Sequence, residues 1–490
     1  MKHGQGLVRH TVFNLMGTVL PLMFAVVSVP LLIHLAGSER FGFLALMWAV
    51  AGYAGLLDLG LSRTMARRVA QGTPERPALA PSAVWQNFRR VLMVGLGVAA
   101  LLQLGWSILG ESLVRRGDIP LQEIDGAVRC VALMVPCIAA TSALRGVLEG
   151  ALRFGAVNLM RGGFTVAAYC VLIAIALLCP ELPSLTAGVL MIRVGDLLAH
   201  ILVVKRELSG WLQTASSTEE SSVWSESAWF MCSQAIVPFT MYMDRFFVGS
   251  IIGLGAVAHY SVPYELATKL LLLPLALSSA LFPRFASQGS GSYELAGRTV
   301  AWLMCLPCLL LIWLGGDVLH LWVRFDVAGE STWALIALVA GVWFNSVAQV
   351  PYAWLQARGF VHVTVGLHLC ELPLYLGLTY LAAERFGIVA VAVAWGVRAA
   401  VDCMALQLLV RHKGGPSFKD CLTGFIGGGC VVLAAVLSSL YLVFAPFWFR
   451  WALALSVGFV MAMFLWLKVV PSATKASVMM RLGIRGGGGG

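Results

Sequence analysis

Charged side chains interrupt several long apolar stretches of this sequence, and they are the residues best suited to chemistry. Guanidinium and ammonium groups neutralise anionic oxygens such as those of phosphate, while carboxylates accept hydrogen bonds from hydroxyl groups. Charge is costly within a membrane-spanning segment, so such residues generally face a protein interior or a wet cavity and serve function. The acidic members are Asp58, Asp196, Asp244, Glu265, Glu371 and Asp402, and the basic members include Arg193, Arg245, Lys269 and Arg398.

The segment MYMDRFFVGS (241–250) places an acid directly before a base. Asp244 and Arg245 are the only charged residues between positions 228 and 252. Adjacent residues of a helix point about 100° apart, so the two are not expected to serve chiefly as a pair. We expect one of them to face a cavity and the other to find a partner elsewhere, and Arg245 is the predicted cavity residue.

Several other charged residues have a structural explanation beside a binding one. Glu265 and Lys269 lie four residues apart, in the order that favours a pair within one helix. Arg63 lies among other arginines at the end of a predicted span, where membrane topology alone explains it. Asp58 lies about one turn inside that border and can cap the helix or pair with Arg63. Arg145 also lies at the inner end of a span, where it marks topology or meets an anionic headgroup.

Two predicted spans share a pattern that indicates an internal repeat. Arg193 is followed by an acid one turn later and by Arg206 thirteen residues later. Arg398 is likewise followed by an acid one turn later and by Arg411 thirteen residues later. The two spans are the sixth and the twelfth, which predicts two parallel six-helix lobes related by a pseudo-two-fold axis along the membrane normal. We expect these arginine–aspartate pairs to clamp each lobe, and Arg193 and Arg398 are secondary binding candidates.

The composition requires a membrane protein. Of 490 residues, 59% are hydrophobic and 12% are charged, whereas soluble domains carry about 25% charged residues. The apolar runs are continuous and of helical length, which predicts an all-α polytopic membrane protein. Most of the 34 lysines and arginines fall on one side of the predicted connections, as expected if both termini are cytoplasmic. The fourteen predicted spans lie near 11–36, 41–61, 88–110, 127–148, 155–180, 186–204, 228–252, 256–283, 299–319, 332–354, 361–382, 387–410, 421–444 and 447–470.

The repeat and the spans together predict a domain organisation. An N-lobe is followed by a cytoplasmic linker, a C-lobe, a further pair of helices and a flexible cytoplasmic tail that ends in five glycines. Pro263, Pro274 and Pro283 are expected to bend the eighth span. The predicted boundaries are 1–210 for the N-lobe, 211–227 for the linker, 228–412 for the C-lobe, 413–470 for helices 13 and 14, and 471–490 for the tail.

The sequence argues against several classes of function. It contains no GxxxxGK[ST] phosphate loop, and its connections are too short to hold a catalytic domain. The eleven cysteines lie almost entirely within spans, and the nine histidines show no HExxH spacing, so we predict no metal site. The net charge of +10 reflects membrane topology, so we expect no nucleic-acid partner. Because no connection can hold a catalytic domain, a carrier is the default interpretation, and we expect no catalytic residues.

Three stretches resemble one family of membrane proteins. GSERFGFLALMWAVAGYAGLLDLGLSRTMARRVA (37–70) is similar to the second-helix signature of polysaccharide flippases, and LEGALRFGAVN (148–158) matches a later motif. The stretch 244–286 resembles the same family across its seventh and eighth helices, with D-R-F, a tyrosine that opens helix eight, and F-P-R. The chain thus resembles Wzx-type O-antigen and exopolysaccharide flippases, in the superfamily of MATE carriers and lipid II flippases.

The resemblance implies two six-helix lobes around a central cavity, and a polyprenyl-diphosphate-linked oligosaccharide moved from the cytoplasmic to the outer leaflet. Helices 13 and 14 resemble the extra pair with which lipid II flippases form a groove for the lipid tail. The family's location is the bacterial inner membrane, its partners are membrane lipids and a glycan polymerase, and its role is lipopolysaccharide or other polysaccharide biosynthesis. Helices 1, 2, 7 and 8 line the cavity in this fold, which gives as binding candidates Arg245, Lys269, Asp244, Glu265, Asp58 and Arg63, with Arg145, Arg193 and Arg398 as secondary candidates.

Two other functions stay open at this point. A MATE-type drug or cation antiporter shares the fold and would use a cavity rich in acids and aromatic residues. An intramembrane glycan polymerase or ligase would form product without a second leaflet. We expect no bound cofactor; coupling to an H⁺ or Na⁺ gradient, or to the membrane potential, would supply the energy.

Overall fold

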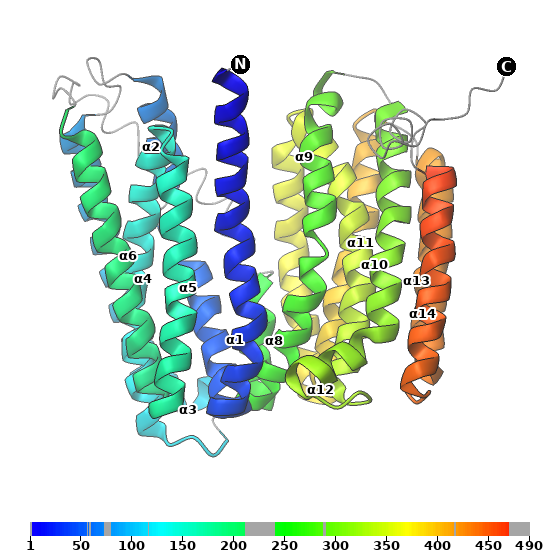
Figure 1. The fold of residues 1–490 in the computed structure, drawn as a ribbon, viewed down its shortest axis with the longest axis horizontal. Coiled ribbons are helices and arrows are strands. Elements are labelled where there is room, and N and C mark those ends of the chain that lie inside the picture. Colours follow the sequence, from blue (N-terminus) through cyan, green and yellow to red (C-terminus); the bar gives the residue numbers. More distant parts are fainter. Residues whose placement is uncertain are drawn as a thin grey trace. The chain divides into compact units, whose positions relative to one another are not determined.

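The computed structural model describes residues 2–55, 57, 60–72, 80–115, 117–210, 241–287, 291–415 and 418–469. All regular secondary structure in these residues is helical, which confirms the predicted all-α fold class (Figure 1). The predicted linker 211–227, the tail 471–490 and the candidate Asp58 lie outside the described residues.

The first of two compact units comprises residues 1–258. Within it α4 packs against α2, α3 and α6, and α1 packs against α5. Its elements are α1 (Lys2–Ala54), α2 (Leu61–Gln71), α3 (Pro81–Leu113), α4 (Leu121–Gly150), α5 (Phe154–Leu178), α6 (Leu182–Leu208), a helical stretch at 241–247 that continues as the π-helix η2 (Val248–Ile252), and the start of α8 (Leu254–Lys269).

The second unit comprises residues 259–490. Here α11 packs against α12, and α10 packs against α11 and α13. The predicted six-helix lobes divide the chain at 211–227 instead, and that division stays a prediction. The elements of this unit are the rest of α8, α9 (Leu272–Ser287), α10 (Gly291–Val323), α11 (Glu330–Ala357), α12 (Val361–His412), α13 (Phe418–Leu442), α14 (Phe447–Phe464) and the π-helix η3 (Leu465–Val469).

Ten helices of the described residues are long and apolar enough to cross a membrane, which confirms a polytopic membrane protein. Two of them each contain two predicted spans. The helix α1 bends at Gly37 (φ 85°), and α12 bends at Gly387 (φ 74°), both at backbone conformations that L side chains rarely adopt. Figure 1 shows α1 running from the N-terminus and turning at its lower end. The predicted count of fourteen spans stays a prediction.

The predicted eighth span is broken into α8 and α9 at residues 270–271. Pro274 explains the break, because it has no N–H to donate to the Leu270 carbonyl and its ring clashes with that group. The chain turns there through short bonds, from Leu270 N–H to the Ala267 carbonyl and from Leu271 N–H to the Thr268 carbonyl. The expected bend in this span is therefore present, and it falls just before the middle one of its three prolines.

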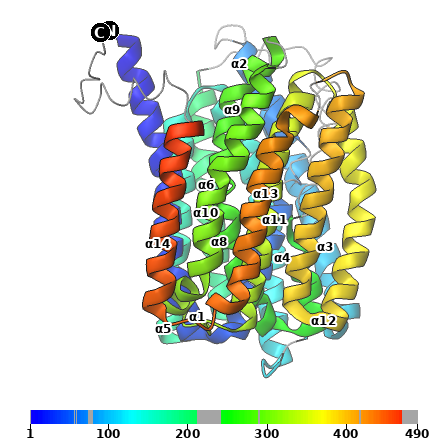
Figure 2. The same cartoon turned by 90° about the vertical axis from the view of Figure 1, so that its right-hand side faces the viewer.

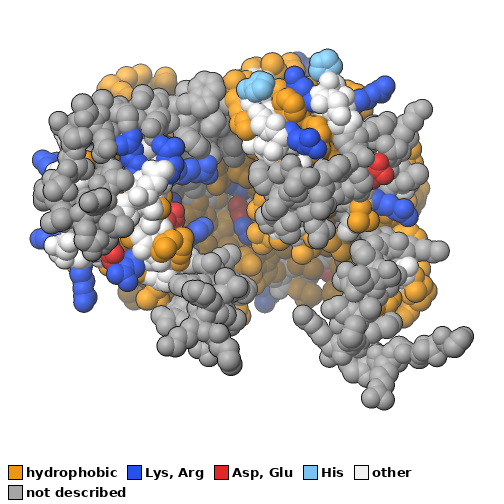
Figure 3. Space-filling view, turned by 90° about the horizontal axis from the view of Figure 1, so that it is seen from above, with side chains coloured by type: hydrophobic (Ala, Val, Ile, Leu, Met, Phe, Trp, Pro, Cys, Tyr) orange, Lys and Arg blue, Asp and Glu red, His pale blue; other side chains and the backbone are white. Residues whose placement is uncertain are grey.

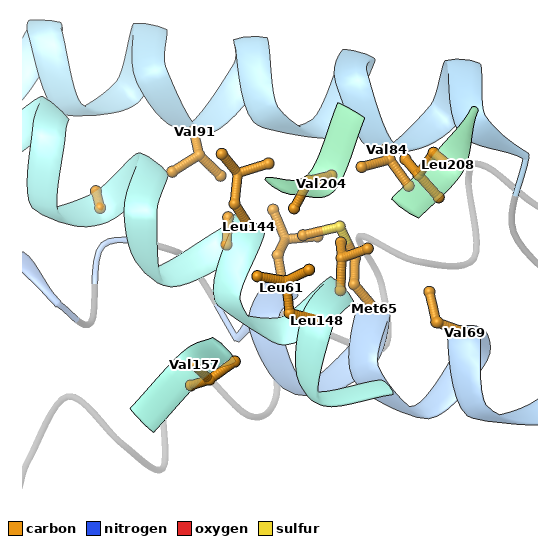
Figure 4. Close-up of a cluster of buried hydrophobic side chains, with 13 residues drawn as sticks. Leu61, Met65, Val69, Val84, Val91, Leu144, Leu148, Val157, Val204 and Leu208 are labelled. Atoms are coloured by element: carbon orange, nitrogen blue, oxygen red, sulfur yellow. The ribbon is translucent and has the colours of Figure 1, made fainter. Parts of the chain in front are cut away.

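A short amphipathic helix, α2, follows the described part of the second predicted span. Its apolar side chains Leu61 and Met65 are fully buried against α3, α4 and α6 (Figure 4). Gly146 and Gly150 of α4 permit this packing, because a Cβ at either position would overlap the backbone of α2. Small residues four apart let helix backbones approach closely in membrane proteins. The packing turns the exposed Arg63 away from the core of this unit.

The last two helices, α13 and α14, both pack on α10 within the second unit (Figure 2). A buried ion pair holds α14 in place: Arg450 donates from Nε to Asp317 Oδ2 at 3.0 Å and from a terminal nitrogen to Oδ1. The same guanidinium donates to the carbonyls of Val443 (3.0 Å) and Ala445 (2.6 Å). Arg450 therefore satisfies backbone carbonyls of the turn that follows α13 and fixes the connection between the two helices.

Candidate functional site

Asp244 and Arg245 are both buried within the first unit, with 0% and 3% of their surface exposed. A carboxylate oxygen of Asp244 accepts a hydrogen bond from the Arg245 backbone N–H at 2.7 Å. The Arg245 guanidinium lies 5.3 Å from the centre of the Tyr242 ring, within reach of a cation–π contact. Tyr53 of α1 contacts Tyr242 with the two ring centres 5.7 Å apart and the planes tilted by 60°, so the ring that faces the arginine is itself packed against an aromatic residue. The predicted role of Arg245 in binding a substrate stays a prediction.

Glu265 and Lys269 form the intrahelical pair that their spacing predicts. The Lys269 ammonium lies 2.7 Å from Glu265 Oε2, near the C-terminal end of α8. Both side chains are about half exposed, at 50% for Glu265 and 47% for Lys269. An exposed pair of this kind contributes little to stability, at most about 0.5 kcal/mol. The Lys269 ammonium group has two further protons, so it can bind an anionic oxygen in addition to Glu265.

Arg145 and Arg193 have different surroundings in the first unit. Arg145 donates to the Ser142 hydroxyl at 3.1 Å and lies 3.8 Å from Glu149, one turn later on α4. The Nε atom of Arg193 on α6 is buried and makes no hydrogen bond. The charge of Asp196, one turn later, acts on Arg193, and Asp196 Oδ1 also lies 3.0 Å from His200 Nδ1. That nitrogen contacts the Asp196 backbone carbonyl at 2.9 Å, and Asp196 Oδ1 itself makes no hydrogen bond. The expected clamp on this helix therefore includes a histidine that sequence reasoning did not select.

The second unit contains a buried cluster of charges between the two segments of α12. His368 and Glu371 come from the segment before Gly387, and Arg398 and Asp402 come from the segment after it. His368 Nε2 lies 3.4 Å from Asp402 Oδ1, and an Arg398 terminal nitrogen lies 3.9 Å from Glu371 Oε2. We call these four residues the α12 cluster.

The α12 cluster leaves several polar atoms unsatisfied. Both carboxylate oxygens of Glu371, Oδ1 of Asp402 and Nε of Arg398 are buried and make no hydrogen bond. Glu371 and Asp402 are only 7% and 5% exposed. A buried carboxylate without such bonds is costly, so it favours a bound proton or cation.

Within the described residues, one group of three acidic or histidine side chains could hold a cation. Ligand atoms of His368, Glu371 and Asp402 all lie within 4.8 Å of one another. The prediction that no metal binds rested on the absence of an HExxH pattern. The sequence signal for this cation site is the H-x-x-E spacing of His368 and Glu371. Two ligands alone do not indicate a site, and the third, Asp402, comes from the second segment of α12.

The comparisons with known proteins agree with this architecture. The sequence matches the family model described as Polysaccharide biosynthesis protein over residues 7–288, which is more than half of the chain. A Shigella flexneri protein named "Putative O-antigen transporter" is 27% identical over 413 residues, which cover 82% of this chain and 97% of that relative.

Two solved structures share the fold at low sequence identity. The lipid II flippase MurJ, in an inward closed conformation, has a TM-score of 0.64 and 14% identity, covering 98% of this chain and 100% of its own. An inward-facing multidrug resistance transporter of the MATE family has a TM-score of 0.62 and 14% identity, covering 86% of this chain and 98% of its own. Family match, relative and fold agree: the chain belongs to the polysaccharide biosynthesis protein family.

Proposed function

We propose that the protein is a flippase for a polyprenyl-diphosphate-linked oligosaccharide, an O-antigen or exopolysaccharide repeat unit. It moves the sugar head from the cytoplasmic to the outer leaflet by alternating access and is not an enzyme. The observation that carries the proposal is the O-antigen transporter relative, which this chain matches over 97% of that relative's length. A glycan polymerase is the class of enzyme that would consume the product.

The C-terminal helices favour a flippase over a drug antiporter of the MATE type. The lipid II flippase covers 98% of this chain, whereas the MATE transporter covers 86%. Both α13 and α14 pack on α10, and the Arg450–Asp317 ion pair joins α14 to it, so the two helices are an integral part of the second unit. An additional pair of helices suits a cargo with a long apolar tail. A drug antiporter carries no such tail and does not need these helices.

The antiporter remains the second candidate because of the acid-rich α12 cluster. Uptake of ethidium into proteoliposomes distinguishes the two functions, since a cationic drug is cargo for an antiporter and not for this flippase.

Exposed cations of the described residues suit the diphosphate group. Lys269 is about half exposed, and Arg63 lies on the exposed face of α2. Ammonium and guanidinium groups bind phosphate oxygens through charge-assisted hydrogen bonds. We propose that Lys269 contacts the diphosphate during transport and that Arg245 supports the same step from its aromatic surroundings.

The α12 cluster is the proposed site of energy coupling. It has two carboxylates against one guanidinium, and three of their oxygens make no hydrogen bond. A proton or Na⁺ ion bound there would satisfy these oxygens and would favour one arrangement of the two segments of α12. The membrane potential can contribute as well, by about 2.3 kcal/mol per charge per 100 mV for an anion that leaves a negative-inside cell.

Basic residues support an orientation in the bacterial inner membrane with both termini in the cytoplasm. In the first unit, the start of α1, the helix α2 and the end of α6 lie at the same end, at the top of Figure 1. Lysine and arginine side chains are spread over this face, with few acidic ones between them (Figure 3). Basic residues accumulate on the cytoplasmic side of membrane proteins.

A flipping assay tests the proposed function. Purified protein is reconstituted with a fluorescent polyprenyl-diphosphate oligosaccharide, and a membrane-impermeant quencher reports how much lipid has changed leaflet. We expect flipping well above that of empty vesicles and a loss of at least about tenfold in the double variant Arg245→Gln with Lys269→Gln. Arg129→Gln, an exposed arginine of α4, is the matched control. Unchanged flipping in the double variant would contradict the assigned role of these cations.

A further inference from the structure

The first unit contains a cavity of about 640 Å³ that none of the proposed binding residues lines. Its volume lies in the range of sites for small molecules, about 300–1,000 Å³. The side chains of Glu39, Trp106 and Arg115 line it, together with several glycines that expose backbone. Such a lining combines one carboxylate, one guanidinium and one indole ring.

Three separate connections of the chain build this cavity. They are the bend of α1 at residues 37–40, the connection from α3 to α4, and the turn from η2 to α8. Each lies between predicted spans at the side opposite the N-terminus. With cytoplasmic termini, the cavity therefore opens at the outer leaflet, where a flipped sugar head arrives.

The backbone of Arg115 fastens two of these connections together. Its N–H donates to the Gly249 carbonyl at 3.0 Å, and its own carbonyl accepts the Leu254 N–H at 3.0 Å. A terminal nitrogen of its side chain donates to the Ile251 carbonyl at 2.8 Å. A guanidinium has five N–H donors, so the side chain is positioned by one contact and retains donors for a ligand.

Glu39 presents a carboxylate whose charge acts on the neighbouring Arg40 guanidinium without a direct ion pair. The neighbouring Arg40 binds Glu123 in a two-pronged ion pair, at 2.6 and 3.0 Å, and Glu39 takes no part in it. Among the described residues, Glu39 makes no hydrogen bond or ion pair. Its carboxylate lies directly over Gly117 (φ 62°), where a Cβ would overlap it. The glycine thus leaves room for an acid that the fold does not use.

Trp106 provides a fixed aromatic surface in the same cavity. Its indole N–H donates to Asp125 Oδ1 at 2.6 Å, which sets the orientation of the ring. The ring lies against Gly110, where a Cβ would come within 2.8 Å of it. An indole held in this way offers an apolar face on which a sugar ring can stack.

We propose that this cavity binds a sugar unit of the transported glycan at the outer face and so receives the head after translocation. This inference rests on the proposed function. A carboxylate and a guanidinium accept from and donate to sugar hydroxyls, and the indole covers the apolar face of the ring. A diphosphate carries about two negative charges, which a single guanidinium beside a carboxylate does not neutralise. An acyl chain is excluded because it would bury both charged groups without giving them a partner.

The test measures binding of a soluble sugar to the full chain in lipid nanodiscs. The probe is the free oligosaccharide released by mild acid from the lipid-linked glycan of the producing bacterium, followed by isothermal titration calorimetry. We expect Glu39→Gln to weaken binding at least about tenfold, because it removes charge-assisted hydrogen bonds without changing the shape of the side chain. Asp118→Asn makes the same chemical change at an exposed residue of the connection from α3 to α4 that does not line the cavity, and this variant should bind as the native protein does.

Two further measurements separate this inference from the function on which it rests. Inorganic diphosphate should not compete with the oligosaccharide, and competition would overturn the assignment of a sugar. A photo-crosslinker at Ala256 should capture the glycan, and capture of phospholipid or protein instead would overturn it too. Failure of the native protein to flip lipid would refute the flippase. Native flipping combined with native-like binding by Glu39→Gln would refute only the sugar cavity.

Discussion

The helices α6 and α12 carry the same pattern of an arginine followed one turn later by an acid, yet they use it differently. On α6, Asp196 lies near His200 and its charge acts on Arg193, so both of its contacts are with residues of its own helix. On α12, Arg398 and Asp402 find partners across the bend at Gly387. The second arrangement gathers one carboxylate more than the first. A repeated motif therefore becomes a candidate cation site only where a second segment adds an acid.

The Arg450–Asp317 ion pair is buried and fully hydrogen-bonded, so its loss should reduce the unfolding free energy more than any substitution on α6 or α12. Asp317→Asn removes the charge that neutralises the buried Arg450, and breaking such a pair costs about 3–5 kcal/mol. We expect a corresponding loss of unfolding free energy in mixed detergent micelles, followed by circular dichroism. Asp326→Asn, at an exposed acid after the same helix, should leave the unfolding curve unchanged. Equal stability of the two variants would show that the pair does not hold α14.

Among the variants of the two helices, Glu371→Gln in the α12 cluster should have the largest effect on transport. The substitution keeps the shape of the side chain and removes the additional charge that favours a cation. We expect gradient-driven flipping to fall by about tenfold and to lose its dependence on an imposed H⁺ or Na⁺ gradient. Glu384→Gln, at an exposed acid of the same helix, is the matched control. Retained gradient dependence in Glu371→Gln would exclude the cluster as the coupling site.

Asp196→Asn tests whether the pattern on α6 is only structural. It replaces a buried carboxylate that contacts one histidine, so we expect a loss of about 1 kcal/mol of unfolding free energy. The dependence of flipping on an ion gradient should stay as in the native protein. If this variant abolished the gradient dependence, as Glu371→Gln should, the proposed difference between the two helices would be lost.

Glu265→Gln should have the smallest effect. Its partner Lys269 is about half exposed, and exposed pairs one turn apart contribute at most about 0.5 kcal/mol. The thermal midpoint of the purified protein should hardly change, and flipping should not fall because the ammonium group stays in place. A large destabilisation would show that the Glu265–Lys269 pair contributes as much as a buried ion pair and would contradict this prediction.

Local patterns in the sequence predicted much of the fold and less of the candidate sites. Apolar runs predicted the all-helical membrane class, three prolines predicted a bent eighth span, and the four-residue spacing predicted the Glu265–Lys269 pair. The structure breaks that span before one proline, Pro274. The contact between Arg398 and Glu371 could not be read in this way, because it joins residues on two sides of a bend. The same holds for Glu39, whose role depends on where Arg40 and Gly117 lie.

The bends at Gly37 and Gly387 have a practical consequence for mapping topology. Each joins two predicted spans through a single non-helical residue, so these crossings offer almost no connecting loop to a protease, an antibody or an inserted epitope. Insertions there would also have to meet a backbone conformation that only glycine adopts readily. A reporter tag belongs instead in the irregular connection before α11, where the backbone leaves its helices for several residues.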